Sequence, residues 1–571
     1  MHAIQGNVFR VVKYFLFIAV LLFPSQNIDA QHANLPFPVT QRQFQLPVLK
    51  NKPRNPVLRI RITADAPVLL TGLTLTAAGT SRLRDLHTVS VYYRGTDSLA
   101  GDLASGKAKL FGAVSRPGEQ MEVSGKLMLE AGTHYFWVAA DLDPAASLDH
   151  LISISGTSLI LEGKEGKESK TLPVPPVARP VLQRVGVAVR QHGQDGTHTA
   201  RIPGLVTTNK GTLLAIFDAR HDSARDLQGN MDIGLHRSTD GGATWEPIRI
   251  VLDQKEWGGL PEKFNGVSDA CILVDRNSDV IYIAGLWMHG VINPEGEWVE
   301  GLNEQSDVWN HQWRNKASQP GYGVKQTSQF LLVKSTDDGK TWSKPVNITR
   351  MGKKEDWWLW APAPGRGITL KDGTLVFPTQ GRDASGKGFS TVTYSKDGGE
   401  TWITGSPATM AVEVSTTECA VVQLGDGSLM LNMRSGKNKG NTGDDNGRPI
   451  AVSQDMGKTW QEHPASFGAL PEPTCMASLY KHTFLKGRKE RSILLFSNPN
   501  SKTHRENMTI KTSFDDGNTW PVENQVLLDE WRGRGYSCLT SVDEDHIGIL
   551  YESSQADLVF QRIPLSALLN Q

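Results

Sequence analysis

The chain has 571 residues, and its 60 Lys and Arg balance its 60 Asp and Glu, so the formal net charge is zero. This balance argues against a nucleic-acid-binding protein, which normally has a basic excess. Hydrophobic residues make up 39% and charged residues 21%, which excludes a disordered chain, and no apolar run reaches the roughly 18 residues of a membrane-spanning helix.

The first 30 residues predict a secretory signal peptide. Arg10 and Lys13 precede an apolar run at 14–23, and Ala30 is a small residue suited to cleavage. A buried strand or a short anchor is the alternative interpretation of this run. We therefore expect an exported protein that begins near Gln31 and is periplasmic, bound to the cell surface or extracellular.

Residues 31–171 predict a first domain, because short β-rich runs alternate there with polar turns. The pattern favours a β-sandwich, and no group of carboxylates or histidines stands out in it. Residues 172–183 contain four prolines, which favour extended conformations, so we interpret them as a linker between domains.

After the linker, an eight-residue pattern, Ser-x-Asp-x-Gly-x-Thr-Trp, occurs five times. It begins at Ser238, Ser335, Ser395, Ser453 and Ser513, and the last three intervals are 60, 58 and 60 residues. Each box lies between two apolar runs, so it should form a hairpin turn in which Asp accepts backbone N–H bonds and Trp packs inward. A catalytic or calcium-binding role is the alternative, but identical repetition in each unit favours a structural one.

A second turn signal lies inside each unit and divides it into four strands. Gly211, Gly373 and Gly427 each follow a polar residue between two apolar runs. Four antiparallel strands make a propeller blade, and residues 186–571 accommodate six units of about 60 residues. The last unit lacks a box and a fourth strand, so we expect residues 184–190 to supply that strand and close the ring. The predicted fold class is all-β, with a six-bladed propeller at 184–571 behind the β-sandwich.

One unit is longer than the others, since Ser238 and Ser335 are 97 residues apart. The excess falls at 287–323. It is either an ordinary long loop or a segment that selects substrate.

The four cysteines predict no metal site. Cys271, Cys419, Cys475 and Cys538 are far apart and form no CxxC pair. We expect buried thiols, with pairing as the alternative in an exported protein. No cofactor is implied.

The propeller topology brings charged residues from distant parts of the chain to one rim. The boxes and the glycine turns share one face, so the starts of first strands and the loops after second strands share the other. Those positions hold Arg201, Asp269, Glu418, Tyr536, Arg220, Asp222, Asp226, Arg382, Arg434 and Arg505. Guanidinium groups that converge need anionic partners, so this rim predicts a site for an anion.

Several motifs follow one another in a fixed order along the chain. They are the triplet 201–203 (Arg-Ile-Pro), the five boxes, Glu418 ahead of a strand that ends in Arg434, Asn498-Pro499 before Arg505, and the triplet 535–537 (Gly-Tyr-Ser). In this ordered set the sequence resembles the bacterial exo-α-sialidases, or neuraminidases. The resemblance covers about residue 185 to the C-terminus and implies a six-bladed propeller. The first domain is similar to the lectin-like sandwiches of some secreted sialidases. Ala200 stands where many relatives have an aromatic residue.

The resemblance also implies roles for the residues on the predicted rim. Arg201, Arg434 and Arg505 match the triad that holds the sialic acid carboxylate, for which guanidinium forks are suited. Tyr536 matches the nucleophile and Glu418 its general base; sialidases use Tyr where most glycosidases use a carboxylate.

Three further residues follow from the same comparison. Asp226 matches the acid/base that protonates the leaving oxygen, and Asp222 competes with it in the same loop, although the spacing after Arg201 favours Asp226. Arg220 and Asp269 match residues that line the pocket near the carboxylate and the N-acetyl group. Arg382 is either part of the site or only a cation at its rim.

The expected function is therefore retaining hydrolysis of terminal α-linked sialic acid through a tyrosyl-glycosyl intermediate, without a metal or a cofactor. The alternatives are transfer of the sugar, including intramolecular transfer, and a sialic-acid lectin without activity. Expected partners are sialylated glycans, glycoproteins or glycolipids, with no nucleic acid and no membrane span, and the chain is expected to be a monomer.

Overall fold

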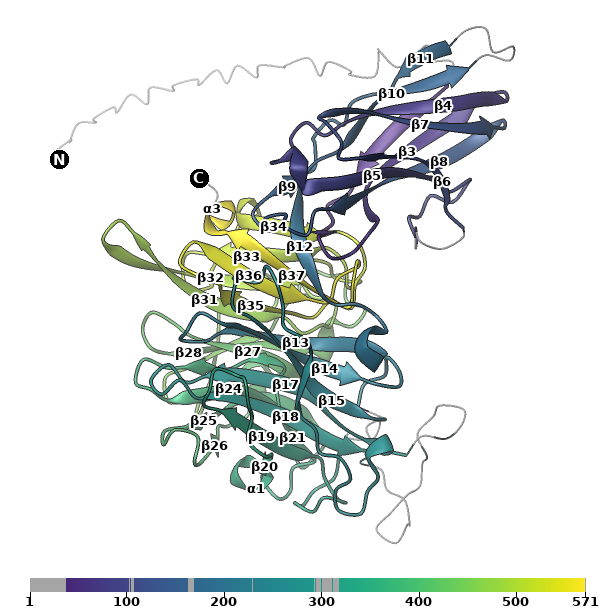
Figure 1. Ribbon diagram of the computed structural model, residues 1–571. Coiled ribbons are helices and arrows are strands. Elements are labelled where there is room, and N and C mark those ends of the chain that lie inside the picture. The colour runs from purple at the N-terminus through teal and green to yellow at the C-terminus, as the bar shows by residue number, and fades with distance from the viewer. Residues whose placement is uncertain are drawn as a thin grey trace, which may run out of the picture.

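The computed structural model describes residues 37–569 except 102, 104–106, 163–168, 228, 292, 294–298, 300–310 and 312–317 (Figure 1). The predicted signal peptide and most of the predicted insertion at 287–323 lie outside the described residues. The regular secondary structure of the described chain is almost entirely β-strand, which agrees with the predicted all-β class.

The N-terminal region forms two antiparallel sheets. One has the order β1-β3-β8-β5-β6 and the other β11-β10-β4-β7. Alternation of apolar and polar residues explains the facing layers: in β7 (Gln120–Leu129), Met121 and Val123 are buried while their neighbours are exposed. The remaining bounds are β1 (Val39–Gln43), β3 (Asn55–Ala64), β4 (Val68–Thr76), β5 (Leu86–Tyr93), β6 (Lys109–Ser115), β8 (Gly132–Leu142), β10 (Ser155–Glu162) and β11 (Ser169–Pro173).

Beyond residue 198 the strands form successive antiparallel units. The first two units are β13 (Thr199–Thr207), β14 (Leu213–Arg220), β15 (Met231–Ser238), β16 (Arg249–Leu252), and β17 (Asn265–Val274), β18 (Ile281–His289), β19 (Gln329–Ser335), β20 (Val346–Asn347). The next contains β21 (Leu359–Pro362), β22 (Gly365–Arg366), β23 (Ile368–Thr369), β24 (Leu375–Arg382), β25 (Gly388–Ser395) and β26 (Ile403–Thr404); β22 pairs back with β17.

The last units complete the series. They are β27 (Thr416–Gln423), β28 (Leu429–Ser435), β29 (Ile450–Ser453), β30 (Gln461–Glu462); then β31 (Ser478–Lys486), β32 (Lys489–Pro499), β33 (Met508–Ser513), β34 (Gln525–Asp529); and β35 (Ser537–Ser541), β36 (His546–Tyr551), β37 (Leu558–Pro564). Short helices α1 (Thr349–Gly352), α2 (Thr409–Val412) and α3 (Leu565–Leu568) lie between or after these strands.

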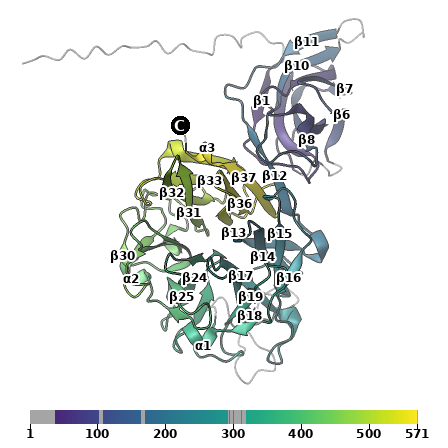
Figure 2. The ribbon, with the colours of Figure 1, turned by 60° about the vertical axis from the view of Figure 1, so that its left-hand side comes forward.

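Each unit contacts the next through an inner strand, which is the first strand in every unit but the third, where it is β24. β13 contacts β17, β17 contacts β24, β24 contacts β27, β27 contacts β31, β31 contacts β35, and β35 contacts β13. Figure 2 shows the units arranged around a common centre. Side chains at the starts of these inner strands are therefore brought together from distant parts of the chain.

The last sheet joins both parts of the chain. β12 (Gln183–Arg190) pairs antiparallel with β37, which is the pairing that the sequence predicted. The sequence did not predict that two strands of the N-terminal region, β2 (Val48–Leu49) and β9 (Leu151–Ile152), pair with β12 as well. Two-residue strands give too short a pattern to detect from sequence.

The five repeated boxes are turns held by their own side chains. In the second box, Asp337 accepts hydrogen bonds from the Thr341 backbone N–H at 2.9 Å and from the Thr341 hydroxyl at 2.6 Å, and the Gly339 N–H donates to Ser335 Oγ at 3.0 Å. The two hydrogen bonds from Thr341 are the main cause that lowers the pKa of Asp337 to about 2. The other four boxes repeat the bonds from Thr to Asp. The geometry therefore favours the structural interpretation of the boxes.

All four cysteines are buried and unpaired. None of the helices in the described part of the chain is long and apolar enough to cross a membrane.

Candidate active site

Three inner strands are interrupted by bulges at the residues singled out from the sequence. The register shifts between Arg201 and Gly204 in β13, between Ser268 and Cys271 in β17, and between Thr416 and Cys419 in β27. A bulge bends a strand and changes the direction of a side chain. Arg201, Asp269 and Glu418 all lie within these irregular segments, and all line one cavity of about 350 Å³.

Tyr536 enters this cavity from the turn just before β35. The preceding Gly535 has a φ of +91°, and a Cβ atom there would lie 2.9 Å from Pro499 Cγ and 3.0 Å from Cys475 Sγ. Only glycine fits both the conformation and the space. The close approach of the backbone therefore sets the position of the Tyr536 side chain.

The Tyr536 hydroxyl is hydrogen-bonded to one carboxylate and one guanidinium group. It donates a short hydrogen bond to Glu418 and accepts one from Arg434 Nη1 at 2.9 Å, and Arg434 also pairs with Glu418. Burial raises the pKa of Tyr536 well above its usual value, and Glu418 adds to this effect while Arg434 opposes it. The phenol is therefore neutral in the unliganded site, with its proton directed at a carboxylate.

Three guanidinium groups surround the Tyr536 ring. Besides Arg434, the Cζ atoms of Arg201 and Arg505 each lie 5.5 Å from the ring centroid. Among the described residues, the Arg505 side chain donates hydrogen bonds only to main-chain oxygens, those of Arg534 at 2.9 Å and Thr474 at 3.3 Å. Its charge is not neutralised by a directly bonded carboxylate, so the cavity favours an anionic ligand.

Arg201 is held in place by Glu552, a residue that the sequence analysis did not identify. Arg201 Nε and Nη2 donate to Glu552 at 2.8 and 3.3 Å, and the same carboxylate accepts the backbone N–H groups of Ile202 and Tyr536, both at 3.0 Å. The Glu552 side chain is buried. One carboxylate thus couples two of the predicted site residues, and a buried Glu at the end of an apolar strand was the signal available in the sequence.

Asp226 lies at the mouth of the cavity. Its Oδ1 is 2.6 Å from Arg220 Nη1 and 3.4 Å from Arg201 Nη1, and 66% of its side chain is exposed. Partial burial raises the pKa of Asp226, but Arg220 and Arg201 more than offset this, so its pKa is below the usual value. Asp222, the competing residue in the same loop, is exposed and does not line the cavity.

Arg220 lies beneath the cavity and is tied to a second carboxylate that sequence reasoning missed. Arg220 Nη2 is 3.0 Å from Asp218 Oδ2, which also accepts a hydrogen bond from Ser268 Oγ at 2.7 Å. Burial raises the pKa of Asp218 to about 6. Asp218 is two residues from Arg220 on β14, so both side chains leave the strand on the same face, and this spacing was the signal available in the sequence.

Asp269 lies on the far wall, where Gln380 Nε2 donates to it at 3.2 Å. Burial raises the pKa of Asp269 well above its usual value, and the charges of Glu418, Asp218 and Asp226 add to the shift. A protonated Asp269 can donate as well as accept a hydrogen bond. Arg382 also lines the cavity, with Nη1 3.4 Å from the Gly386 carbonyl oxygen.

The structure thus brings together seven of the eight predicted site residues as lining of one cavity, with Arg220 directly behind them. Among the residues that the structure describes, no group of three or more His, Cys, Asp or Glu is placed to hold a metal ion.

Comparison with known proteins assigns the class. A family model described as a BNR repeat-like domain matches residues 202–537, and one described as the N-terminal domain of BNR-repeat neuraminidase matches residues 38–165. A sialidase of Bacteroides fragilis is 39% identical, over 92% of this chain and 95% of its own length. A sialidase of Micromonospora viridifaciens is 31% identical, over 66% of this chain and 53% of its own length.

A solved structure of a Hadza microbial sialidase covers 93% of this chain and 100% of its own, at 35% identity and a TM-score of 0.81. These matches define a glycoside hydrolase. The chain belongs to the BNR-repeat neuraminidase family, the sialidases.

Proposed function

We propose that the protein is a retaining exo-α-sialidase that removes terminal sialic acid from glycans through a covalent bond to Tyr536. The observation that carries this proposal is the Tyr536 hydroxyl donating to Glu418 amid three guanidinium groups. The arginines Arg201, Arg434 and Arg505 hold the carboxylate of the sugar, which orients its anomeric carbon toward the phenol oxygen.

In the first step, Tyr536 Oη attacks the anomeric carbon as Glu418 takes its proton, and Asp226 protonates the departing glycosidic oxygen. In the second step, Asp226 takes a proton from water, which attacks the same carbon. The bond from this carbon to Tyr536 breaks as the bond to the water oxygen forms, and the phenolate recovers its proton from Glu418. Two inversions give net retention of configuration.

A neutral nucleophile suits this substrate because the anomeric carbon bears a carboxylate. An anionic nucleophile would be repelled as it approached, whereas the neutral phenol loses its proton to Glu418 only as it attacks. The raised pKa of Tyr536, caused first by burial, keeps the resting phenol neutral.

Asp226 must be protonated to act first as an acid, yet its pKa is low in the unliganded site because of Arg220 and Arg201. When the sugar carboxylate binds Arg201, it offsets part of the positive charge that stabilises the Asp226 carboxylate, and it places a negative charge near Asp226. Both changes raise the pKa of Asp226. Substrate binding thus favours the protonated form of Asp226, which the first step requires.

The test compares Tyr536→Phe and Asp226→Ala with the wild type on a fluorogenic sialoside. We expect kcat to fall at least about 1,000-fold in Tyr536→Phe, because the nucleophile is lost. Tyr551→Phe is the matched control, since its buried hydroxyl bonds Gln561 at 3.1 Å outside the cavity. Absence of turnover by the wild type, or undiminished turnover by both site variants, would contradict the proposal.

NMR of the first released sugar separates the alternatives. The α-anomer of sialic acid indicates retention, an anhydro sugar indicates intramolecular transfer, and binding without release of sugar indicates a lectin. A lectin needs only the arginines, so the contact between Tyr536 and Glu418 favours hydrolysis.

We also propose that residues 1–30 are a signal peptide, 31–171 a β-sandwich, 172–183 a linker and 184–571 a six-bladed propeller, in an exported monomer. The closed series of contacts among the inner strands supports the propeller, and the two facing N-terminal sheets support the sandwich.

A further inference from the structure

The hairpin of β31 and β32 extends beyond the buried part of its unit. In β32, the first four residues are exposed and the last seven are buried. The two strands stay paired over the whole length, from Ser478 and Ser497 to Lys486 and Lys489. Figure 1 shows their joined ends projecting from the molecule. We call residues 484–491 the hairpin tip.

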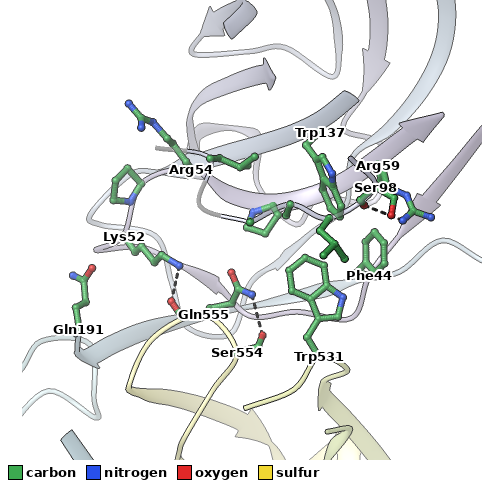
Figure 3. A pocket seen from close by; sticks show the side chains of 16 residues that line it. Phe44, Lys52, Arg54, Arg59, Ser98, Trp137, Gln191, Trp531, Ser554 and Gln555 are labelled. Carbon is green, nitrogen blue, oxygen red and sulfur yellow. Dashed lines mark hydrogen bonds between the residues drawn. The ribbon is translucent and has the colours of Figure 1, made fainter. Parts of the chain in front are cut away.

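The hairpin tip is strongly basic and open to solvent. Its charged residues are one glutamate and four cations, all exposed: Glu490, Lys486, Arg488, Lys489 and Arg491. None of the four cations forms an ion pair with another described residue. Arg59, in contrast, lies in a hollow between the N-terminal and C-terminal regions and donates to the Ser98 carbonyl oxygen at 3.1 Å (Figure 3). The four tip cations are thus free to bind an external anion.

The pairing register places like charges opposite each other in the hairpin tip. Lys486 pairs with Lys489, and Phe484 pairs with Arg491 two residues further along, so all four side chains leave the ribbon on one face. Glu490 belongs to the other face. Like charges directly opposite each other destabilise a pair of strands. An anion bound between the two lysines would remove this cost.

Two apolar side chains accompany the cations of the hairpin tip. Leu485 is 57% exposed, and the Phe484 ring stacks on His482 with centroids 5.7 Å apart. Gly487 has a φ of +66°, as the first central residue of a tight two-residue turn requires, so the tip is narrow and preformed. Charge alone would suit any polyanion. An exposed leucine among the cations suits a surface that is both anionic and apolar, as a lipid bilayer is.

A run of carboxylates lies at the base of the hairpin rather than at its tip. His482 contacts the Glu544 carbonyl oxygen at 3.1 Å, which places the acidic residues 543–545 beside it. Lys486 is four strand residues beyond His482, or about 13 Å. Charges in solvent are largely screened beyond about 8 Å at physiological salt. The positive potential of the hairpin tip is therefore not cancelled by these carboxylates.

The hairpin tip and the cavity around Tyr536 lie at opposite ends of the same unit. Thr474, shortly before the start of β31, and Arg505, after the end of β32, both line that cavity. The tip lies at the other end of the two strands, and the nine residues of β31 span about 27 Å. A surface that binds the tip therefore leaves the mouth of the cavity open on the far side.

We propose that the hairpin tip docks the protein on the surface of an anionic phospholipid membrane, with the cavity around Tyr536 facing away from that surface. The four cations of the tip pair with lipid phosphates, and Leu485 enters the headgroup layer. Phosphates beside Lys486 and Lys489 relieve the repulsion across the ribbon. This inference goes beyond the proposed hydrolysis, because docking requires no reaction.

Co-sedimentation with vesicles tests the proposal. The vesicles contain phosphatidylcholine alone, or phosphatidylcholine with an equal part of phosphatidylglycerol. We expect the protein to bind only the vesicles with phosphatidylglycerol, and to be released at high salt because the attraction is electrostatic. The double variant Lys486→Gln/Lys489→Gln should bind at least about tenfold more weakly. Leu485→Ala should bind at least about threefold more weakly, because an apolar contact with the membrane is lost.

Lys340→Gln/Lys344→Gln is the matched control. Both lysines are exposed and lie at the turn of the second box, so the change of charge is the same as in the tip variant. This control should leave vesicle binding unchanged. Thermal unfolding reports whether each variant folds. If Lys486→Gln/Lys489→Gln does not fold, Arg488→Gln, in the exposed turn of the tip, decides instead.

Three outcomes would overturn the proposal: no binding to either kind of vesicle, equal binding to both kinds, or binding that the substitutions in the tip leave unchanged. Retention on immobilised heparin without binding to vesicles would overturn it as well, since the tip would then recognise a polysaccharide. Turnover of a small soluble sialoside is a separate readout, which the tip variants should leave unchanged. Failure of the proposed hydrolysis is thus distinguished from failure of the docking surface.

Discussion

At the scale of single residues, the site contains carboxylates that hold other site residues in place and are not expected to contact the substrate. Glu552 accepts four hydrogen bonds, two from Arg201 and two from backbone N–H groups. The residues expected to touch substrate were predictable because their order along the chain forms a pattern. Glu552 belongs to no such pattern, because its contacts join residues more than 300 positions apart.

We expect Glu552→Gln to lower kcat/KM about 10- to 100-fold, because a charged hydrogen-bonded partner of Arg201 is lost. Steady-state kinetics on a fluorogenic sialoside measures this. An unchanged kcat/KM would show that Arg201 needs no partner.

The same variant should alter the stability of the fold in acid. Burial raises the pKa of Glu552, but Arg201 and the backbone donors more than offset this, and its pKa lies below the usual 4.5. Its carboxylate therefore stabilises the fold above about pH 4.5, and this contribution is lost as the pH falls through the lowered pKa. Urea unfolding between pH 7 and 3 should show a smaller loss of stability in Glu552→Gln than in the wild type; parallel curves would contradict this.

At the scale of elements, turns and bulges decide where the side chains point. The strands were predictable from alternation and from the repeated boxes, but a bulge leaves no comparable pattern. Asp269 has a φ of 54°, and so departs from strand geometry within β17. Gly535 likewise sets the position of Tyr536 without a sequence pattern that reveals it. Both its positive φ and its crowded surroundings require glycine at this position.

Gly535→Ala should therefore lower both activity and stability. The positive φ costs an alanine about 1 kcal/mol. In addition, the new Cβ atom would lie 2.9–3.1 Å from atoms of Pro499, Cys475 and Arg505. Gly427→Ala is the matched control, since Gly427 has a φ of +94° with no atom within 4 Å. Thermal unfolding and kcat of the two variants separate crowding from backbone strain; equal effects would show that crowding contributes nothing.

At the scale of the whole molecule, the N-terminal region completes the last sheet. Leu49 lies on β2, yet its buried side chain packs with residues of the C-terminal units such as Ile510 and Leu539. A linker and two separate domains were expected from the sequence, and the contact between them was not. The two parts of the chain should accordingly depend on each other for stability.

Leu49→Ala tests this dependence. Because Leu49 is fully buried, we expect a loss of about 2–5 kcal/mol and a lower melting temperature for the C-terminal units. Leu485→Ala, at a site 57% exposed, should change stability by less than about 0.5 kcal/mol. Calorimetry measures both, and equal melting temperatures for the two variants would rule out the dependence.

The sequence by itself determined the all-β class, the repeated turns and the set of arginines with Tyr536, Glu418 and Asp226, because these features lie in local patterns and in an ordered series of motifs. The tertiary structure alone decided that Glu552 and Asp218 support those residues, and that β2 and β9 pair with β12. These features depend on contacts between distant segments. The zero net charge of the whole chain concealed the arginines around Tyr536, because charges are largely screened beyond about 10 Å at 0.1 M salt and only folding brings like charges to one place.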